Sequence, residues 1–157
     1  MLIRLGTEYI YAYPGGCSMP LHQALREKRD RIRTILPRHE QGGCFAAQGI
    51  ARSTGKVGVC MATSGPGATN LLTGAALATT NRLPALLLPS DTFATRVADP
   101  VLQQLEQPHD IGLTVNAAFR PVSKFFDRVQ RPEQLFSIAL AAMRVLTDPA
   151  ETGAVAA

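Results

Sequence analysis

The residue of this sequence best placed for chemistry is Glu40, within Arg38-His39-Glu40-Gln41-Gly42-Gly43. The run before it, 32–37, is apolar, contains β-branched residues and ends in proline, as strands often do. The run after it, 43–52, is rich in alanine and has apolar residues at helical spacing. Glu40 is therefore expected where a strand ends and a helix begins, which is where open α/β sheets bind ligands.

A carboxylate at this position also has a purely structural explanation. The dipole of a helix favours a negative charge in its first turn by about 0.3–1 kcal/mol. Taken alone, Glu40 fits this role better than a functional one. Its interpretation therefore depends on the other strand ends.

Two further strand ends carry motifs, Tyr13-Pro14-Gly15-Gly16 and Thr63-Ser64-Gly65-Pro66-Gly67. In a parallel sheet all three motifs lie on one edge, and glycine allows close approach of the backbone to a ligand. This arrangement predicts one site, lined by glycine on two sides and carrying one carboxylate, that accepts a flat ligand. The candidate binding residues are Gly15, Gly16, Glu40, Gly65, Gly67 and Asn70.

The remaining pattern alternates strands and helices. Strands are expected over 9–13, 32–36, 57–62, 84–89 and 121–126, with a sixth beginning at 153. Helices are expected from about 19 to 28, after Glu40 to about 52, from 67 to about 81 and from 131 to 146, with short helical pieces over 93–115. This order predicts an α/β fold: an open parallel sheet of about six strands with helices on both faces and right-handed crossovers.

Composition limits the partners. The chain has 157 residues, 46% hydrophobic and 18% charged, which suits one globular domain. Its dense basic group, 26–33, contains Glu27 and Asp30, so it fits a solvated helix end better than a nucleic-acid surface. No apolar run approaches the ~20 residues of a membrane span. The three cysteines have no metal-ligand spacing, which favours reduced, buried thiols in a cytoplasmic protein.

Dinucleotide binding is a weaker alternative. Gly65-Pro66-Gly67 follows a strand and opens a helix, and Asp91 ends the next strand, where an acid could bind a ribose. The position of the third glycine is occupied by Asn70, however, and several βα units precede the motif. The sequence therefore favours another ligand.

The three strand-end motifs together resemble a known family. Tyr13-Pro14-Gly15-Gly16, Arg38-His39-Glu40-Gln41-Gly42 and Ala62-Thr63-Ser64-Gly65-Pro66-Gly67-Ala68-Thr69-Asn70 look like the pyrimidine-binding domain of thiamine-diphosphate enzymes, the group that includes acetolactate synthase. The resemblance covers nearly the whole chain, residues 1–157. It implies the fold of that domain and thiamine diphosphate as cofactor.

The resemblance also implies roles for residues. Glu40 would be catalytic, because the matching glutamate hydrogen-bonds a ring nitrogen of the cofactor's aminopyrimidine and stabilises its protonated or imino form. Gly15, Gly16, Gly65 and Gly67 would shape the pocket, and Asn70 would secure its loop or simply start a helix. The cofactor supplies the carbanion chemistry, while the protein supplies orientation and electrostatics.

The two halves of the chain resemble different members. Residues up to about Gly74 are most similar to acetolactate synthase. From about Asn81 the sequence looks like the trihydroxycyclohexane-dione hydrolases of inositol catabolism, and Ser90-Asp91-Thr92 replaces the Gly-Gln-Val usual in the synthases. The resemblance therefore favours hydrolysis of a carbon–carbon bond in a cyclic dione, with acetolactate synthesis or a non-catalytic dimerisation module as alternatives. The mixed character fits either a divergent member or a composite sequence.

No motif matches the domain that carries the diphosphate and its magnesium ion in this family. The resemblance therefore implies one pyrimidine-binding domain, 1–157, truncated in its last strand and inactive alone. Its expected partners are a small-molecule substrate and either further copies, as a homodimer or larger homo-oligomer, or a separate diphosphate-binding domain. The uncharged helix 67–80 is the expected contact surface.

Overall fold

The computed structural model describes residues 1–91, 93–94, 105, 109–110 and 113–157. The helices are α1 (Met19–Glu27), α2 (Glu40–Thr54), α3 (Pro66–Thr69), α4 (Leu72–Thr80) and α5 (Gln134–Leu146). The strands are β1 (Tyr9–Ala12), β2 (Arg33–Ile35), β3 (Gly58–Ala62), β4 (Ala85–Pro89), β5 (Phe125–Phe126) and β6 (Ala154–Ala156). Three 3-10 helices complete the described elements: η1 (Leu2–Leu5), η2 (Gly16–Ser18) and η3 (Val115–Val122).

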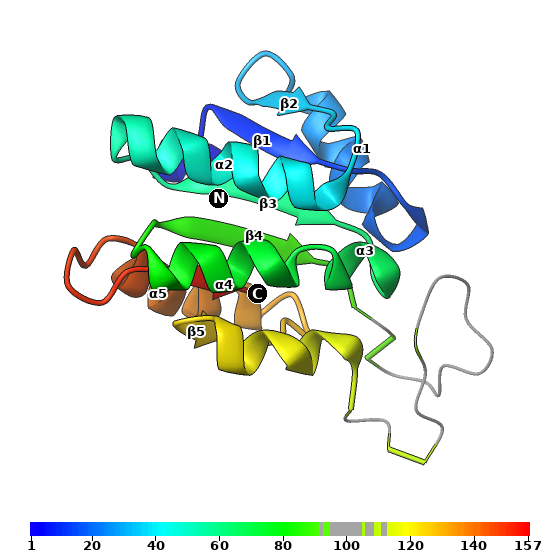
Figure 1. The fold of residues 1–157 in the computed structure, drawn as a ribbon. Coiled ribbons are helices and arrows are strands. Elements are labelled where there is room, and N and C mark those ends of the chain that lie inside the picture. Colours follow the sequence, from blue (N-terminus) through cyan, green and yellow to red (C-terminus); the bar gives the residue numbers. More distant parts are fainter. Residues whose placement is uncertain (92, 95–104, 106–108, 111–112) are drawn as a thin grey trace.

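The strands form one parallel sheet in the order β2-β1-β3-β4-β6-β5. Helices α2 and α4 cover one face of the sheet, and α1 and α5 cover the other (Figure 1). The predicted open α/β fold is confirmed. The strand order reverses between β1 and β3, so the carboxyl ends of these two neighbours flank the point where such folds bind ligands.

The central strand β3 shows why the sheet is buried on both faces. Cys60 and Ala62 belong to the cluster under α2 and α4, whereas Val59 and Met61 belong to the cluster under α1 and α5. Alternate side chains of a strand point to opposite faces, and every residue of β3 is buried. The nearly continuous apolar run of the sequence over 57–62 suits this two-sided burial.

Two sequence predictions need correction. The helix expected over 67–81 is two helices, α3 and α4. Between them the Leu71 N–H bonds the Ala68 carbonyl, three residues back, instead of the carbonyl four residues back that an α-helix uses. The strand expected over 121–126 was wrong for its first four residues. Pro121 and Val122 finish the 3-10 helix η3, and only Phe125 and Phe126 pair with β6. The helical pieces expected over 93–115 lie mostly outside the described residues.

The cysteines divide into two groups. Cys44 and Cys60 are buried free thiols, as predicted, whereas Cys17 is only partly buried and accepts a hydrogen bond from the Ser64 hydroxyl. The Cys60 thiol donates a hydrogen bond to Cys44, and this bond together with burial raises the pKa of Cys60 well above its usual value. Across the described part of the chain, no helix is both long and apolar enough to cross a membrane.

One backbone position stores strain that can be tested. Arg82 follows α4 with a φ of 51°, and no other described non-glycine residue has a positive φ. The Leu83 N–H bonds the Ala78 carbonyl there, so this is a helix end that usually takes glycine. We expect Arg82→Gly to raise the free energy of unfolding by up to about 1 kcal/mol, as strain relief exceeds the added unfolded-state entropy. Urea unfolding measures this. Arg82→Ala is the control, because it removes the same side chain but keeps the Cβ, and equal effects of the two variants would contradict the explanation.

Candidate cofactor site at the carboxyl ends of the strands

Glu40 is the first residue of α2, directly after β2 and its connection, as predicted. His39 precedes it in an extended conformation, so the chain turns into the helix at Glu40. The Glu40 side chain is 11% exposed, and its Oε2 lies 4.0 Å from Nε2 of the exposed His39. A carboxylate this enclosed needs a hydrogen-bond partner.

That partner is Asn70, at the end of α3. Asn70 Nδ2 donates to Glu40 Oε2 over 2.9 Å. The other carboxylate oxygen, Oε1, lies beside Gly67, where an added methyl group would be 3.3 Å away. No residue within the described part of the chain donates a hydrogen bond to Oε1. Asn70 therefore orients the carboxylate and leaves Oε1 facing the glycine turn.

Thr63 lies between the two glycine turns. A methyl group on Gly15 would be 2.4 Å from Thr63 Cβ, and one on Gly67 would be 2.7 Å from Thr63 Cγ2. Thr63 is 6% exposed, and its hydroxyl has no hydrogen-bond partner among the described residues. Both glycines are therefore required by Thr63 itself, a reason that the sequence analysis missed. In the sequence, the only indication of this role is that Thr63 is the first residue after β3.

The remaining predicted residues occupy the same two turns. Gly16 opens η2, and the Ser18 hydroxyl bonds both the N–H and the carbonyl of Gly15, which fixes that turn. Gly65 has a φ of 61° and a ψ of −122°, a conformation that a side chain would strain. The structure thus brings the turns of Gly15 and Gly67 together on Thr63, with Glu40 and Asn70 beside them.

The position of Glu40 is set by the packing of α2. A methyl group on Gly58 would be 2.0 Å from the Ala47 carbonyl oxygen, so α2 touches the backbone of β3. On its other side, the buried Gln48 donates from Nε2 to the Gly74 carbonyl of α4 over 2.9 Å. These two contacts hold α2 against both β3 and α4, and thereby hold Glu40 within reach of Asn70.

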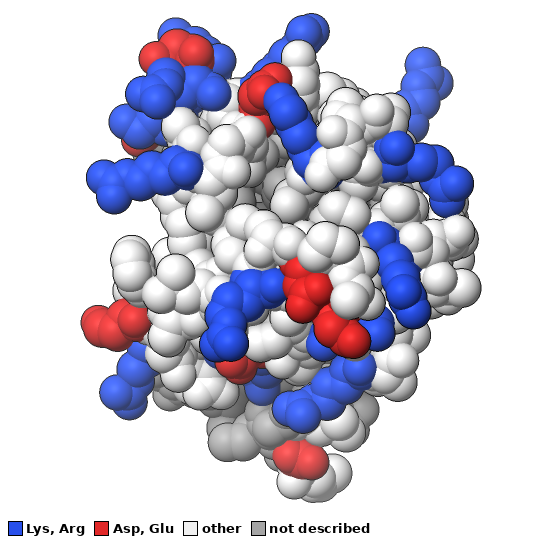
Figure 2. Space-filling model, turned by 90° about the vertical axis from the view of Figure 1, so that its left-hand side faces the viewer, with Lys and Arg blue, Asp and Glu red and all other residues white. Residues whose placement is uncertain are grey.

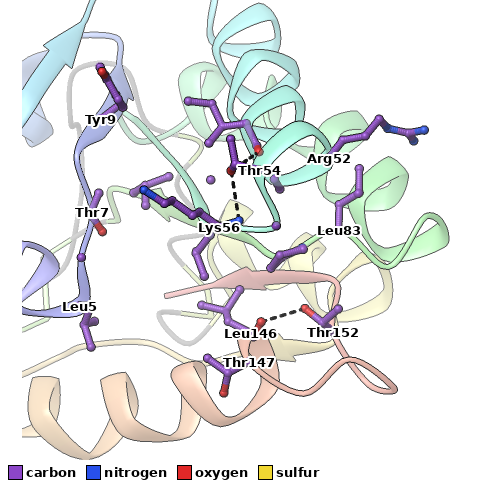
Figure 3. Close-up of a pocket in the computed structure, with 18 of the residues that line it drawn as sticks. Leu5, Thr7, Tyr9, Arg52, Thr54, Lys56, Leu83, Leu146, Thr147 and Thr152 are labelled. Atoms are coloured by element: carbon purple, nitrogen blue, oxygen red, sulfur yellow. Dashed lines mark hydrogen bonds between the residues drawn. The ribbon is translucent and has the colours of Figure 1, made fainter.

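A pocket of about 1050 Å³ lies at the opposite end of the sheet. It is lined by the residues that precede β1, β3 and β4 and by the ends of α2 and α5. Figure 2 shows Lys and Arg around this face with acidic groups among them. The polar groups are paired with one another: Lys56 with Glu8 at 2.6 Å, and the Thr54 hydroxyl with the Ile50 carbonyl and the Lys56 N–H (Figure 3). This pocket is remote from Glu40, and these polar groups of its lining satisfy one another.

Metal ligation was not expected here. In the described ranges, no three His, Cys, Asp or Glu side chains gather closely enough to hold a metal ion.

Comparison with known proteins identifies the family. Residues 1–111 match the family model described as "Thiamine pyrophosphate enzyme, N-terminal TPP binding domain". This chain belongs to that family. Its cofactor is therefore thiamine pyrophosphate, the compound also called thiamine diphosphate.

Individual relatives match over most of the chain. The 3D-(3,5/4)-trihydroxycyclohexane-1,2-dione hydrolases of Clostridium botulinum (strain Alaska E43) and Geobacillus thermodenitrificans are 52% and 53% identical over 142 residues, 89% of this chain. The hydrolase of Clostridium perfringens (strain 13) is 50% identical over the same length. The chain spans only 22% of the length of each of these relatives. The resemblance to these hydrolases stated from the sequence is confirmed.

The contact between Gly15 and Thr63 gives a stability test. We expect Gly15→Ala to lower the free energy of unfolding by about 1–3 kcal/mol, because the methyl group forces Thr63 out of its place. Gly15 has an extended backbone, so the cost is steric. Gly42→Ala is the control: nothing lies within 4 Å of the new methyl group, and alanine favours the helix by about 0.5–1 kcal/mol. Thermal and urea unfolding compare the two. If Thr63→Ala does not rescue Gly15→Ala in a double-mutant cycle, the contact is not the cause.

Proposed function

We propose that this chain supplies the pyrimidine-binding half of the active site of an enzyme that hydrolyses a carbon–carbon bond in a cyclic polyhydroxylated dione. The observation that carries the proposal is the Glu40 carboxylate, held by Asn70 at the strand ends of a thiamine-diphosphate-binding domain. The 50–53% identity to trihydroxycyclohexane-dione hydrolases supports the substrate class. Acetolactate synthesis is less favoured, because Ser90-Asp91-Thr92 follows β4 where the synthases have Gly-Gln-Val.

The residues at the strand ends suit a flat, nitrogen-containing ring. The turns of Gly15 and Gly67 have no side chains, and Thr63 keeps them apart as a spacer. Glu40 Oε1 lies at the edge of this space and can accept a hydrogen bond from a protonated ring nitrogen. The pyrimidine pocket would therefore be formed by Glu40 and the five residues named with it from the sequence: Gly15, Gly16, Gly65, Gly67 and Asn70.

The contribution of this chain to the reaction is proton control. When bound, thiamine diphosphate supplies a nucleophilic carbon for attack on the substrate carbonyl. A Glu40 carboxylate beside the ring would favour protonation of the ring nitrogen next to Oε1. Asn70 donates to Oε2, and this hydrogen bond restrains rotation of the carboxylate. Gly15 and Gly67 exclude side chains, and with them other hydrogen-bond partners, from this position.

The rest of the active site would come from elsewhere. The diphosphate and a magnesium ion would be held by a diphosphate-binding domain, either of the same protein or of a partner, and the isolated chain would show no turnover. The described exposed residues of α4 are Thr73, Leu77 and Thr80, none of them charged. This face would pack against the partner in a homodimer or larger assembly. The buried free thiols fit a reducing compartment such as the cytoplasm.

The proposed role of Glu40 can be tested in a chimera in which this chain replaces the matching residues of the Clostridium botulinum hydrolase. Glu40→Gln keeps the size of the side chain and an acceptor oxygen for Asn70 but removes the charge. We expect hydrogen–deuterium exchange at the thiazolium carbon and dione hydrolysis to slow by about 10²–10⁴-fold, with cofactor binding largely retained. Glu8→Gln is the matched control, since Glu8 is exposed at the opposite end of the sheet. Normal exchange in folded Glu40→Gln, with only a small loss of stability, would make Glu40 a helix-start residue and end the proposal.

The proposed partner surface makes a separate prediction. Leu77 is 44% exposed on the uncharged face of α4. We expect Leu77→Lys to weaken self-association or chimera assembly by at least about tenfold, because a lysine cannot be buried there without a partner charge. Sedimentation velocity over a range of concentrations measures this. Phe136→Lys, an equally apolar change on α5, is the control, and equal loss in both variants or a monomeric wild-type chain at high concentration would contradict the assignment to α4.

A further inference from the structure

The face of the sheet that α1 and α5 cover is less completely covered than the other. Strands lie about 4.8 Å apart and packed helices about 8–10 Å apart, so one helix covers about two strands of a sheet. On the opposite face, three helical elements, α2, α4 and η3, lie over the six strands (Figure 1). In the described part of the chain, the second face has two α-helices and the short η1. A strip over the central strands β3 and β4 is therefore left between α1 and α5.

This strip is an apolar groove of about 640 Å³. Met61 of β3 and Leu88 of β4 lie at its floor, and residues of α1 and α5 form its walls. Three apolar side chains of its lining are open to solvent: Met1 is 47% exposed, Leu21 of α1 is 49% exposed and Leu135 of α5 is 45% exposed. Apolar surface that several elements contribute to one concave patch is typical of a binding surface.

Helix α1 has an apolar side that this chain does not bury. Leu21, Ala24 and Leu25 of α1 line the groove, yet none of the residues of α1 is buried. Every other described α-helix has buried residues. Most of the stability of a short helix in a protein comes from packing of its apolar side. The side of α1 that faces the groove therefore needs a further apolar surface.

The dimensions of the strip match a helix. Strands β3 and β4 have five residues each, so the strip is about 17 Å long at about 3.3 Å per residue. An α-helix of about 11 residues, or three turns, has the same length. A groove with a sheet as its floor and helices as its walls is also the surface on which a neighbouring helix packs in α/β domains. One further helix would give both faces of the sheet three helical elements.

The charged residues of the lining indicate what such a helix would carry. Lys28 follows α1 on one side of the groove, and Asp127 follows β5 on the other. Neither side chain forms an ion pair within the described residues, whereas Asp91 and Arg128 are paired with each other. A helix with acidic residues along one side of its apolar row and basic residues along the other would pair with both Lys28 and Asp127.

We infer that the groove between α1 and α5 binds one amphipathic helix of a partner polypeptide. This helix has about three turns, an apolar side that packs over β3 and β4, acidic residues beside Lys28 and basic residues beside Asp127. The inference does not depend on the proposed function, because neither Glu40 nor either glycine turn lines the groove. It assigns a second partner surface to the domain, on the face of the sheet opposite α4.

The test is a titration of the ¹⁵N-labelled 157-residue chain with a synthetic amphipathic peptide. The peptide has about 14 residues, with a row of leucines that has glutamate along one side and lysine along the other. We expect saturable NMR shifts of the Leu21 and Leu135 amide signals. Hydrogen exchange in α1 should also become slower, because the bound peptide buries its exposed side. A peptide of the same composition but without helical periodicity should bind at least about tenfold more weakly.

Substitutions on the two walls of the groove locate the binding. Leu135→Asp should weaken binding at least about tenfold, because the new carboxylate would be buried without a partner. Leu140→Asp is the matched control and should bind as wild type, since Leu140 is 58% exposed on the same helix but does not line the groove. Lys28→Glu should weaken binding about two- to fivefold, but should not change binding of a peptide with glutamine at every charged position.

Three results of the titration would overturn the inference: no saturable binding of the amphipathic peptide, equal loss in Leu135→Asp and Leu140→Asp, or an equal effect of Lys28→Glu on both peptides. Two further results would overturn it by assigning the groove to another occupant. Saturable binding of dodecanoate at the same signals, without binding of the peptide, would assign it to an acyl chain. Loss of self-association in Leu135→Asp would assign it to a second copy of this chain.

Discussion

The close approach of α2 to β3 and α4 is the contact on which the candidate site depends. Gly58 lets the backbone of β3 touch Ala47, and Gly74 leaves its carbonyl open to Gln48. A side chain at either glycine would push α2 away from its neighbours. Because Glu40 begins this helix, such a shift would be passed directly to the carboxylate and would break its 2.9 Å bond to Asn70. The chemistry at one end of α2 is therefore fixed by packing along its length.

The site combines rigid support with an incomplete set of partners. Thr63, Ser18 and Asn70 hold the two glycine turns and the carboxylate in place through contacts inside this chain. Glu40 Oε1, in contrast, accepts no hydrogen bond from the described part of the chain. Preorganised acceptors of this kind lose little conformational freedom when a ligand arrives. The site is thus held in place by contacts inside this chain, although one of its acceptor atoms has no donor.

Much of this arrangement could be predicted from the sequence, because it follows from local patterns. An apolar strand followed by a helix start predicted the position of Glu40. The order of the three motifs predicted that the glycine turns lie beside it. The role of Thr63 could not be predicted, because it depends on two glycine turns far apart in the chain that meet only in the folded sheet. The strand expected over 121–126 was mostly wrong for a related reason. Pro121 and Val122 belong to η3 rather than to the sheet, and periodicity over six residues does not separate a strand from a 3-10 helix.

The brevity of the outer strands limits how copies of the domain can meet. The sheet ends in β2, with three residues, on one side and β5, with two, on the other. Edges this short offer few unpaired N–H and carbonyl groups to a neighbouring chain. Short edge strands are one way in which proteins prevent two sheets from pairing edge to edge. Growth into continuous sheets across molecules is therefore disfavoured. Copies of this domain that associate would therefore meet through helices rather than through the edges of the sheet.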